Sequence, residues 1–453
     1  MLHSFPKLRR LTLRCPAEHL SGSIELSASS FGPLVGTVEE LDFRGVLPSD
    51  LSVFTRLRQL RFTCAQGWSV RGTSALASAA PSLTHLEQLG WEDMGDYAYL
   101  TRLTQLRVLN LRARAFDDAR PLAALTALED LDLLMSGVAD LAPLARLCSL
   151  QRLTVPQSCH LATLSGLTAL TALRYLSCTC REGDVSQPTD VSFLSSFSLL
   201  QHLDLLYSWE TSLRDVAAAA PFLTALTLAP DHPGPQDAPL DLSFLPLLTR
   251  LESFTLSGNA NDASCGCIGQ LPSLRSLLLS NTTAMTPAGI LWFTSLTRLE
   301  TLHLMQCNNV LVDVSHLGRL SSLTSLTLEA YGPWHHMQPT QPPPLDLLPL
   351  LQLRLRSLSL PFCDDAMLRT VARLRSLRRL RLHSGTFADA SMLALAQLAG
   401  LEELFLSTTP VANAPLRVTN AGIMAPTALP FLRRYTVAGQ QHRRQCDGPY
   451  VWN

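Results

Sequence analysis

A six-residue pattern, L-x-x-L-x-L, recurs eighteen times along this chain with small substitutions. Clear copies are LRRLTL at 8–13, LEDLDL at 128–133, LTSLTL at 323–328 and LRRLRL at 377–382. Most successive copies begin 22 to 28 residues apart. A unit repeated at such a period buries its apolar face by stacking on its neighbours. The pattern therefore predicts a solenoid whose core is one continuous apolar column.

Each copy of the pattern has the alternation of a half-buried β-strand. In LEDLDLLMS at 128–136, Leu131 and Leu133 are expected to point inward, whereas Asp130 and Asp132 point outward. Strands of successive repeats should pair in parallel as one sheet of about 18 strands on the inner, concave face. The return segments then cross the outer, convex face.

The return segments, which connect successive strands, fall into two classes. The segments at 138–150 and 189–200 resemble those of a short repeat class of about 22 residues, which form 3₁₀ turns. The segments at 363–377 and 387–401 have apolar residues spaced i, i+3, i+4 and i+7, with acidic or small residues at the start. That spacing predicts short α-helices.

The repeats predict one elongated domain over 1–453, although the length alone would suggest about three domains. Two proline-rich insertions, at 230–239 and 332–344, should form surface loops because proline continues neither a strand ladder nor a helix. The second contains Trp334 and the pair His335 and His336, which is a poor metal site because zinc takes three or four ligands. The C-terminal tail, 440–453, is expected to fold back over the last repeat.

The pattern resembles the leucine-rich repeat superfamily over about residues 5 to 440. It mixes a short class of about 22 residues with a longer, cysteine-containing class. The resemblance implies an α/β solenoid curved like a horseshoe, and it places Cys307 and Cys363 as buried ladder cysteines. The ladder position that carries asparagine in many members is asparagine here only at Asn259, so we expect a less regular coil.

Charge and lysine content exclude several functions. The formal net charge is −1, which lacks the basic field that nucleic-acid binding uses. Of the 36 lysine and arginine residues only Lys7 is lysine, which leaves 35 arginines. P-loop enzymes, protein kinases and pyridoxal-phosphate enzymes each need a lysine within a motif that is absent. We therefore expect no cofactor, no catalytic activity, no nucleic-acid partner and no small-molecule ligand.

Cysteine distribution bears on location. The eleven cysteines are dispersed over separate repeats, and neither end has the cysteine cluster that closes many secreted repeat proteins. No segment has the apolar length of a signal peptide or a membrane span. We predict a cytoplasmic protein with reduced thiols and no contact with a membrane.

A basic cluster stands out among the outward strand positions. Arg378, Arg379, Arg381 and His383 come from one repeat and should repel one another unless acidic groups lie opposite. The alternative is a solvated face whose neighbouring charges compensate. Arginine is favoured at interfaces because its planar fork binds carboxylates bidentately. The cluster is the strongest candidate contact for an acidic segment of a protein.

Two other places are candidate contacts. An acidic step at Asp130 and Asp132 is joined farther along by Tyr175. The fourth repeat is irregular, with Gln88 at an apolar position and with Trp91 and Tyr97 nearby. These aromatic residues either form an interaction patch or fill a badly packed repeat.

A low-charge track of serine and threonine also follows the outward positions from 224 to 359. Threonine is a good strand residue on an exposed face, so the track fits a plain solvated surface. Taken together, the sequence predicts a non-catalytic scaffold that binds a protein partner on its concave sheet. The alternative is a substrate-receptor or regulatory subunit of an enzyme complex, such as a ubiquitin-ligase adaptor or a phosphatase or GTPase regulator.

Overall fold

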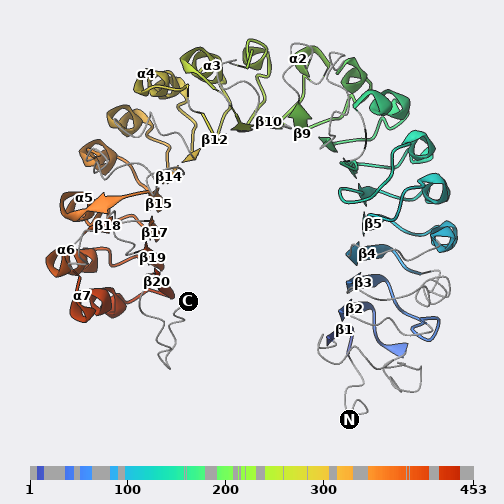
Figure 1. Ribbon diagram of the computed structural model, residues 1–453, viewed down its shortest axis with the longest axis horizontal. Helices are drawn as coiled ribbons and strands as arrows, with labels where there is room; N and C mark the ends of the chain where they lie inside the picture. The colour runs from blue at the N-terminus through green and yellow to red at the C-terminus, as the bar shows by residue number, and fades with distance from the viewer. Residues whose placement is uncertain are drawn as a thin grey trace. The chain divides into compact units, whose positions relative to one another are not determined.

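The computed structural model describes residues 8–14, 36–44, 51–63, 82–89, 97–157, 159, 161–178, 191–207, 213, 216–219, 221–230, 240–258, 260–282, 284–305, 314–329, 345–383, 385–386, 388–407 and 418–438. The chain forms two compact units, Met1–Leu223 and Thr224–Asn453. Within each unit, strands line one side and short helices line the other (Figure 1). Residues 231–239 and 332–344 of the predicted insertions and the tail at 440–453 lie outside the described residues. One continuous domain over 1–453 stays a prediction.

The described part of the first unit contains nine strands, each parallel to the next along the chain. They are β1 (Arg10–Arg14), β2 (Glu40–Arg44), β3 (Gln59–Thr63), β4 (His85–Leu89), β5 (Val108–Arg112), β6 (Asp130–Asp132), β7 (Arg152–Thr154), β8 (Tyr175–Cys178) and β9 (His202–Tyr207). The register keeps equivalent repeat positions side by side, as Leu109, Leu131 and Leu153 show on β5, β6 and β7. Residues one repeat apart are therefore neighbours on the same face.

The second unit continues the same plan with nine further strands in its described residues. They are β10 (Ala225–Pro230), β11 (Ser253–Ser257), β12 (Ser276–Ser280), β13 (Thr301–Met305), β14 (Ser325–Glu329), β15 (Ser357–Leu360), β17 (Arg379–Leu382), β19 (Glu403–Ser407) and β20 (Arg434–Ala438). The two units thus supply 18 parallel strands, as the sequence predicts. A separate two-stranded pairing joins β16 (Cys363–Asp364) to β18 (Gly385–Thr386).

The return segments of the first unit are mostly 3₁₀-helical in the residues described. They are η5 (Ala98–Arg102), η6 (Arg120–Ala124), η7 (Ala142–Arg146), η8 (Leu161–Leu167) and η9 (Ser192–Ser196), followed by the one-turn helix α2 (Val216–Ala219). Proline in the first turn of η6 and η7 suits a helix start, because the N–H that proline lacks has no helical partner there. The 3₁₀ turns predicted within 138–150 and 189–200 are confirmed.

The second unit adds α-helices among its return segments. The described elements are η10 (Leu245–Leu247), α3 (Asp262–Ile268), α4 (Pro287–Leu291), η11 (Trp292–Ser295), η12 (Ser315–Arg319), η14 (Leu348–Gln352), α5 (Asp365–Val371), α6 (Asp389–Ala394), η15 (Leu395–Gln397), α7 (Asn420–Met424) and η16 (Ala425–Ala428). The helices predicted within 363–377 and 387–401 are confirmed as α5 and α6.

The core lies between the two layers of each unit and is built from the inward strand positions. Leu131 and Leu133 are fully buried, as their alternation with aspartate predicts. Removing a leucine side chain from water stabilises the fold by about 1.5–3 kcal/mol, and each repeat contributes several such residues. The stack of repeats therefore shares one apolar column within each unit.

The described cysteines support a structural role for these thiols. No disulfide joins Cys148, Cys159, Cys178, Cys265, Cys267 or Cys363. Burial raises the pKa of Cys363 well above its ordinary range, and the nearby Asp364 and Asp365 add to the effect. A thiol that stays protonated is a poor nucleophile. Cys307 lies outside the described residues.

Aspartates tie the outer helices of neighbouring repeats together in the second unit. Asp262, at the start of α3, accepts hydrogen bonds from the backbone N–H (2.8 Å) and hydroxyl (2.6 Å) of Thr286, the residue that caps α4. Asp389 makes the same pair of bonds, 2.8 and 2.6 Å long, to Thr419, which caps α7. Each aspartate satisfies a donor that the end of the next helix leaves free.

Glycine makes room for these inter-repeat bonds. A Cβ atom at Gly289 would stand 2.6 Å from Asp262 Oδ1, and one at Gly422 would stand 2.1 Å from Asp389 Oδ1. Both glycines follow their capping threonine by three residues. The same Asp, Thr and Gly arrangement therefore recurs in two separate repeats.

Candidate functional site

The outward side of the strands carries a ladder of ion pairs between neighbouring repeats. In the first unit, Arg61 Nε lies 2.5 Å from Glu87 Oε2, and Arg107 Nη1 lies 3.0 Å from Glu129 Oε1. In the second unit, Arg275 Nη1 lies 2.5 Å from Glu300 Oε1. Such exposed pairs each contribute about 0–1 kcal/mol to the stability of the fold. Their main effect is to leave little unbalanced charge along most of the face.

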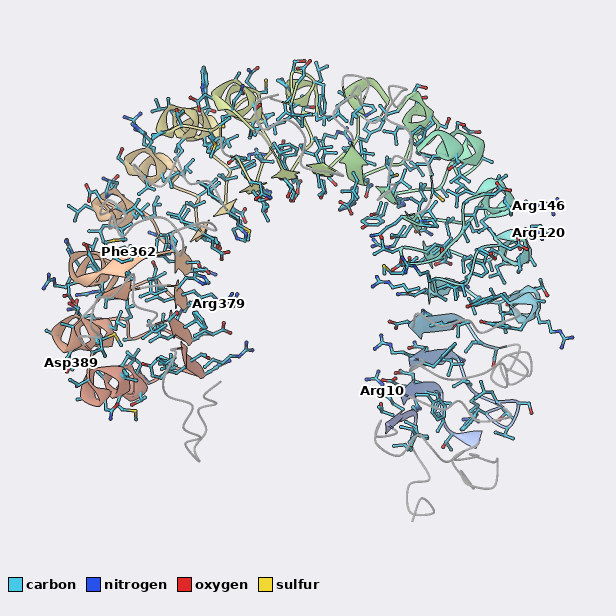
Figure 2. The ribbon with its side chains drawn as sticks, viewed as in Figure 1. Arg10, Arg120, Arg146, Phe362, Arg379 and Asp389 are labelled. Carbon is cyan, nitrogen blue, oxygen red and sulfur yellow. The ribbon has the colours of Figure 1, made fainter. Side chains whose placement is uncertain are left out.

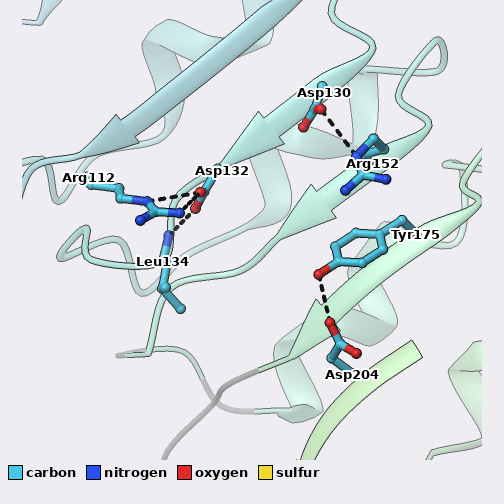
Figure 3. Close-up of polar contacts among 7 residues, drawn as sticks. All are labelled: Arg112, Asp130, Asp132, Leu134, Arg152, Tyr175 and Asp204. Carbon is cyan, nitrogen blue, oxygen red and sulfur yellow. Dashed lines mark hydrogen bonds and ion pairs between the residues drawn. The ribbon is translucent and has the colours of Figure 1, made fainter. Parts of the chain in front are cut away.

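The acidic step that the sequence singles out is held by arginines of the adjacent strands (Figure 3). Arg112 donates to Asp132 Oδ2 from both Nε (3.0 Å) and Nη2 (2.6 Å). Asp132 Oδ1 accepts a further bond from the N–H of Leu134, at 3.0 Å. On the next strand, Arg152 Nε lies 3.2 Å from Asp130 Oδ2. Asp130 and Asp132 are therefore paired rather than free to bind a cation.

Tyr175 belongs to the same polar network. The guanidinium carbon of Arg152 lies 4.2 Å from the centre of the Tyr175 ring, and the Tyr175 hydroxyl donates to Asp204 Oδ2 at 2.6 Å. The His202 ring stands 6.3 Å from the Tyr175 ring, centre to centre. Figure 3 shows Asp130, Arg152, Tyr175 and Asp204 in succession. The structure thus brings three predicted residues, Asp130, Asp132 and Tyr175, to one region of the first unit.

Sequence reasoning missed the two arginines that organise this region. Arg152 occupies the repeat position of Asp130 and Tyr175, because the register pairs Asp130 with Arg152 and Arg152 with Tyr175. Arg112 lies on β5, one strand before Asp132. A comparison of equivalent outward positions in consecutive repeats would have found Arg152.

The environment of Tyr175 gives a pH-dependent prediction. Burial, the hydrogen bond to Asp204 and the charge of that carboxylate together raise the pKa of Tyr175 from about 10 to about 12. Because the folded pKa exceeds the unfolded one, the associated stability is present below about pH 10 and is lost as the pH rises to about 12. We expect Asp204→Asn to lower the pKa of Tyr175. Alkaline titration of phenolate absorbance, with Tyr175→Phe subtracted, measures this, and an unchanged pKa would contradict it.

The aromatic patch expected near the fourth repeat is corrected at Tyr97. Only 7% of Tyr97 is exposed, and its ring packs edge-on against Phe116, with centres 4.9 Å apart. Gln88 is also buried, and it donates to the Tyr97 hydroxyl at 3.5 Å and accepts from the Tyr99 hydroxyl at 3.2 Å. Tyr97 therefore packs the core beside a buried glutamine, which is the second of the two interpretations. Trp91 lies outside the described residues.

The basic cluster of the second unit faces carboxylates from the following repeat. Arg378 Nη1 lies 3.9 Å from Glu402 Oε1, and Arg379 Nε lies 3.8 Å from Glu403 Oε2. Figure 2 shows Arg379 extending from the strand side, away from the helices. These contacts reduce the repulsion that the sequence implies between neighbouring arginines.

His383 is engaged by two earlier strands. Its Nε2 lies 3.6 Å from Glu329 Oε1 and 3.1 Å from Ser359 Oγ. On the other side, its ring centre lies 5.7 Å from that of Phe405. His383 is therefore a positioned part of this surface.

Arg381 differs from the other arginines of the strands. Seven strand arginines have described side chains, and six of them form an ion pair: Arg10, Arg61, Arg112, Arg152, Arg379 and Arg434. Among the described residues, Arg381 has no ion pair or hydrogen bond, and it is exposed. In the register it lies beside Phe405. The structure thus leaves one strand arginine uncompensated, next to an aromatic side chain.

The serine and threonine track lies in one line, as equivalent repeat positions predict. Ser253, Ser276, Thr301, Ser325 and Ser357 are successive partners, and the line ends at Arg379. A second line is interrupted by Leu278 and His303, which sequence reasoning passed over. Burial lowers the pKa of His303, partly offset by Glu329. The track leads directly to the basic cluster.

Among the described residues, no group of three or more His, Cys, Asp or Glu side chains is placed to hold a metal ion. In the same residues, no helix has the length and apolar character needed to span a membrane.

Comparison with solved structures gives the fold. TLR13, solved in a complex with ssRNA13, has a TM-score of 0.51 at 18% identity, covering 95% of this chain and 66% of that one. An internalin from Listeria monocytogenes has a TM-score of 0.37 at 17% identity, covering 89% and 88% of the two chains. The LRR protein LIC12759 of Leptospira interrogans has a TM-score of 0.42 at 16% identity, covering 85% and 92%. All are leucine-rich repeat proteins.

The likeness to TLR13 agrees with the architecture described above, and the chain has the leucine-rich repeat fold. No protein-family model and no curated protein matches the sequence. At such low identity the comparisons establish the fold and not the ligand.

Proposed function

We propose that this leucine-rich repeat chain is a binding module that holds a protein partner against the outward side of its strands. The fold supports an interaction role, since its neighbours are leucine-rich repeat proteins of binding type. Outward side chains of consecutive repeats stand at fixed spacing on a rigid sheet, so a partner that binds there orders little additional backbone. The partner contact that we favour is the part of the basic cluster formed by Arg379, Arg381 and His383.

The observation that carries this proposal is the uncompensated charge of Arg381. The six other described strand arginines have carboxylate partners within this chain. A guanidinium with no such partner keeps its donors for an external carboxylate. Phe405 beside it offers apolar area, and arginine with aromatic side chains is the composition of interface hot spots. An acidic segment of a protein is the ligand that this pairing fits.

The test replaces both arginines of the strand. Arg379→Glu with Arg381→Glu should weaken the free energy of binding to the main partner by at least about 2 kcal/mol, the size of a hot-spot effect. Both side chains are exposed, so the melting temperature should change little. Proximity labelling in the native cell identifies the partner, and quantitative pulldown compares the variant with the wild type.

The matched control is Arg319→Glu with Arg369→Glu, which changes the charge equally on η12 and α5. It should bind the partner as the wild type does. Undiminished binding by the Arg379 and Arg381 variant, at unchanged stability, contradicts the proposed contact.

A further inference from the structure

A groove of about 790 Å³ lies in the second unit beside the strand surface. It is lined by Arg354, Arg356, Ser376, Arg378, Glu402, Phe431 and Arg433. The residues that precede strands β15, β17, β19 and β20 are in line, since the N–H of Arg378 donates to Arg356 O, that of Glu402 to Arg378 O, and that of Arg433 to Glu402 O. The groove therefore follows four consecutive repeats along the sheet edge where the strands begin.

The groove concentrates positive charge that this chain does not neutralise. Four arginines line it against one glutamate. Arg378 is held by Gly400 O at 2.9 Å and by Glu402 at 3.9 Å. Among the described residues, Arg354, Arg356 and Arg433 form no ion pair, and all three are exposed. At the same repeat position before β12 and β13, Arg275 and Glu300 are paired at 2.5 Å, so the imbalance is local.

The rest of the lining is apolar or already satisfied. Phe431 is 59% exposed, which is unusual for an aromatic side chain in this structure, where most are buried. The Ser376 hydroxyl donates to Leu355 O at 2.7 Å, so it serves the scaffold. Recognition in the groove therefore depends on the guanidinium groups and the Phe431 ring.

The spacing of the charges selects among anions. Adjacent strands lie about 4.8 Å apart, so the row from Arg356 to Arg433 extends over roughly 14 Å. One phosphate group is too small to contact both ends of that row. An extended peptide presents side chains on one side every two residues, about 6.6–7 Å apart, so two or three carboxylates reach separate arginines. Glu402, between Arg378 and Arg433, favours an uncharged residue at that step.

We propose that this groove receives an acidic segment of the protein partner. Its carboxylates bind Arg356, Arg378 and Arg433, and an apolar residue packs on Phe431. Guanidinium groups bind carboxylates through two parallel hydrogen bonds, which fixes the segment in register. The inference rests on the proposed protein-binding function and extends it to a second contact, distinct from Arg381.

Fluorescence anisotropy with a labelled six-glutamate peptide tests the groove in the full chain. The peptide should bind the wild type, whereas a six-glutamine peptide should not. Arg356→Glu with Arg433→Glu should lower the affinity for the six-glutamate peptide at least about tenfold, because two contacts become repulsive. The charge-matched Arg319→Glu with Arg369→Glu should change binding less than about twofold, since exposed charges beyond a Debye length are screened. Thermal melts establish that each variant is folded.

Several results overturn the inference. One is that the six-glutamate peptide does not bind. Another is that Arg356→Glu with Arg433→Glu and Arg319→Glu with Arg369→Glu weaken its binding equally. A third is that a singly phosphorylated neutral peptide or a six-nucleotide RNA binds more tightly and in a groove-dependent way. If Arg379→Glu with Arg381→Glu weakens partner binding but Arg356→Glu with Arg433→Glu does not, the groove is refuted and the proposed function stands. If Arg356→Glu with Arg433→Glu weakens partner binding but Arg379→Glu with Arg381→Glu does not, the groove is supported and the proposed strand contact is refuted.

Discussion

Phe254→Ala should destabilise the second unit by about 3–5 kcal/mol, the usual cost of removing a buried aromatic side chain. Phe254 lies on β11 and is fully buried. Its neighbours in the register are Leu226 on β10 and Leu277 on β12, both inward residues. The truncation removes apolar area from the core and leaves a cavity that stacked repeats close only in part. Chemical unfolding followed by circular dichroism measures the loss as a lower midpoint.

Leu247→Ala is the matched control for this substitution. Leu247 ends η10 in the same repeat as Phe254 and is 67% exposed. Its truncation should change stability by no more than about 0.5 kcal/mol, as is usual for surface substitutions. Equal midpoints for the two variants would show that the apolar column between the layers does not carry the stability of this unit.

Asp389→Ala should lower the free energy of unfolding by about 2 kcal/mol, the second largest effect that we expect. The carboxylate accepts two bonds from Thr419, and bonds to charged groups contribute about 1.5–3 kcal/mol when shielded from water. We take the lower part of that range because Asp389 is partly exposed. The substitution also leaves the first turn of α7 without its partner in the preceding repeat.

A double-mutant cycle with Thr419→Ala separates this interaction from other effects of the substitutions. We expect a coupling free energy of about 1 kcal/mol for the hydroxyl bond, which either substitution removes, whereas the backbone N–H bond is lost only with Asp389. Asp140→Ala provides a comparison, because Asp140 accepts a bond only from the nearby Ala142 N–H among the described residues. A coupling near zero, or an equal loss from Asp140→Ala, would show that the link between α6 and α7 does not stabilise the fold.

The candidate sites were only partly predictable, and the reasons differ from residue to residue. Arg379 and Arg381 could be placed on the outward face because they alternate with Leu380 and Leu382, which are buried. Their neighbours could not be placed, since Glu403 belongs to a different repeat and its register depends on how the return segment packs. The sequence left Tyr97 either in an interaction patch or in the core, because the irregular fourth repeat gives no alternation to follow. Its burial is set by Phe116 and Gln88, which come from other segments.

The groove was beyond sequence reasoning for a related reason. Arg354, Arg378 and Arg433 lie on different repeats, separated by return segments of unequal length. Each by itself is an ordinary exposed arginine in a chain that has almost no lysine. Only their alignment along the sheet edge shows that Glu402 is the single carboxylate among the four arginines of the lining.

The sequence by itself determined the repeat, the strand at the head of each repeat, the direction in which its side chains point and the type of several return segments. Those features are local, since an alternation of two or a spacing of three and four residues is complete within one repeat. The tertiary structure decided which polar and charged groups of different repeats pair with one another. Arg152 pairs with Asp130, 22 residues away, and Asp389 pairs with Thr419, 30 residues away. Such contacts depend on the stacking register, because a neighbour in the next repeat is close in space only after both repeats have packed on the shared core.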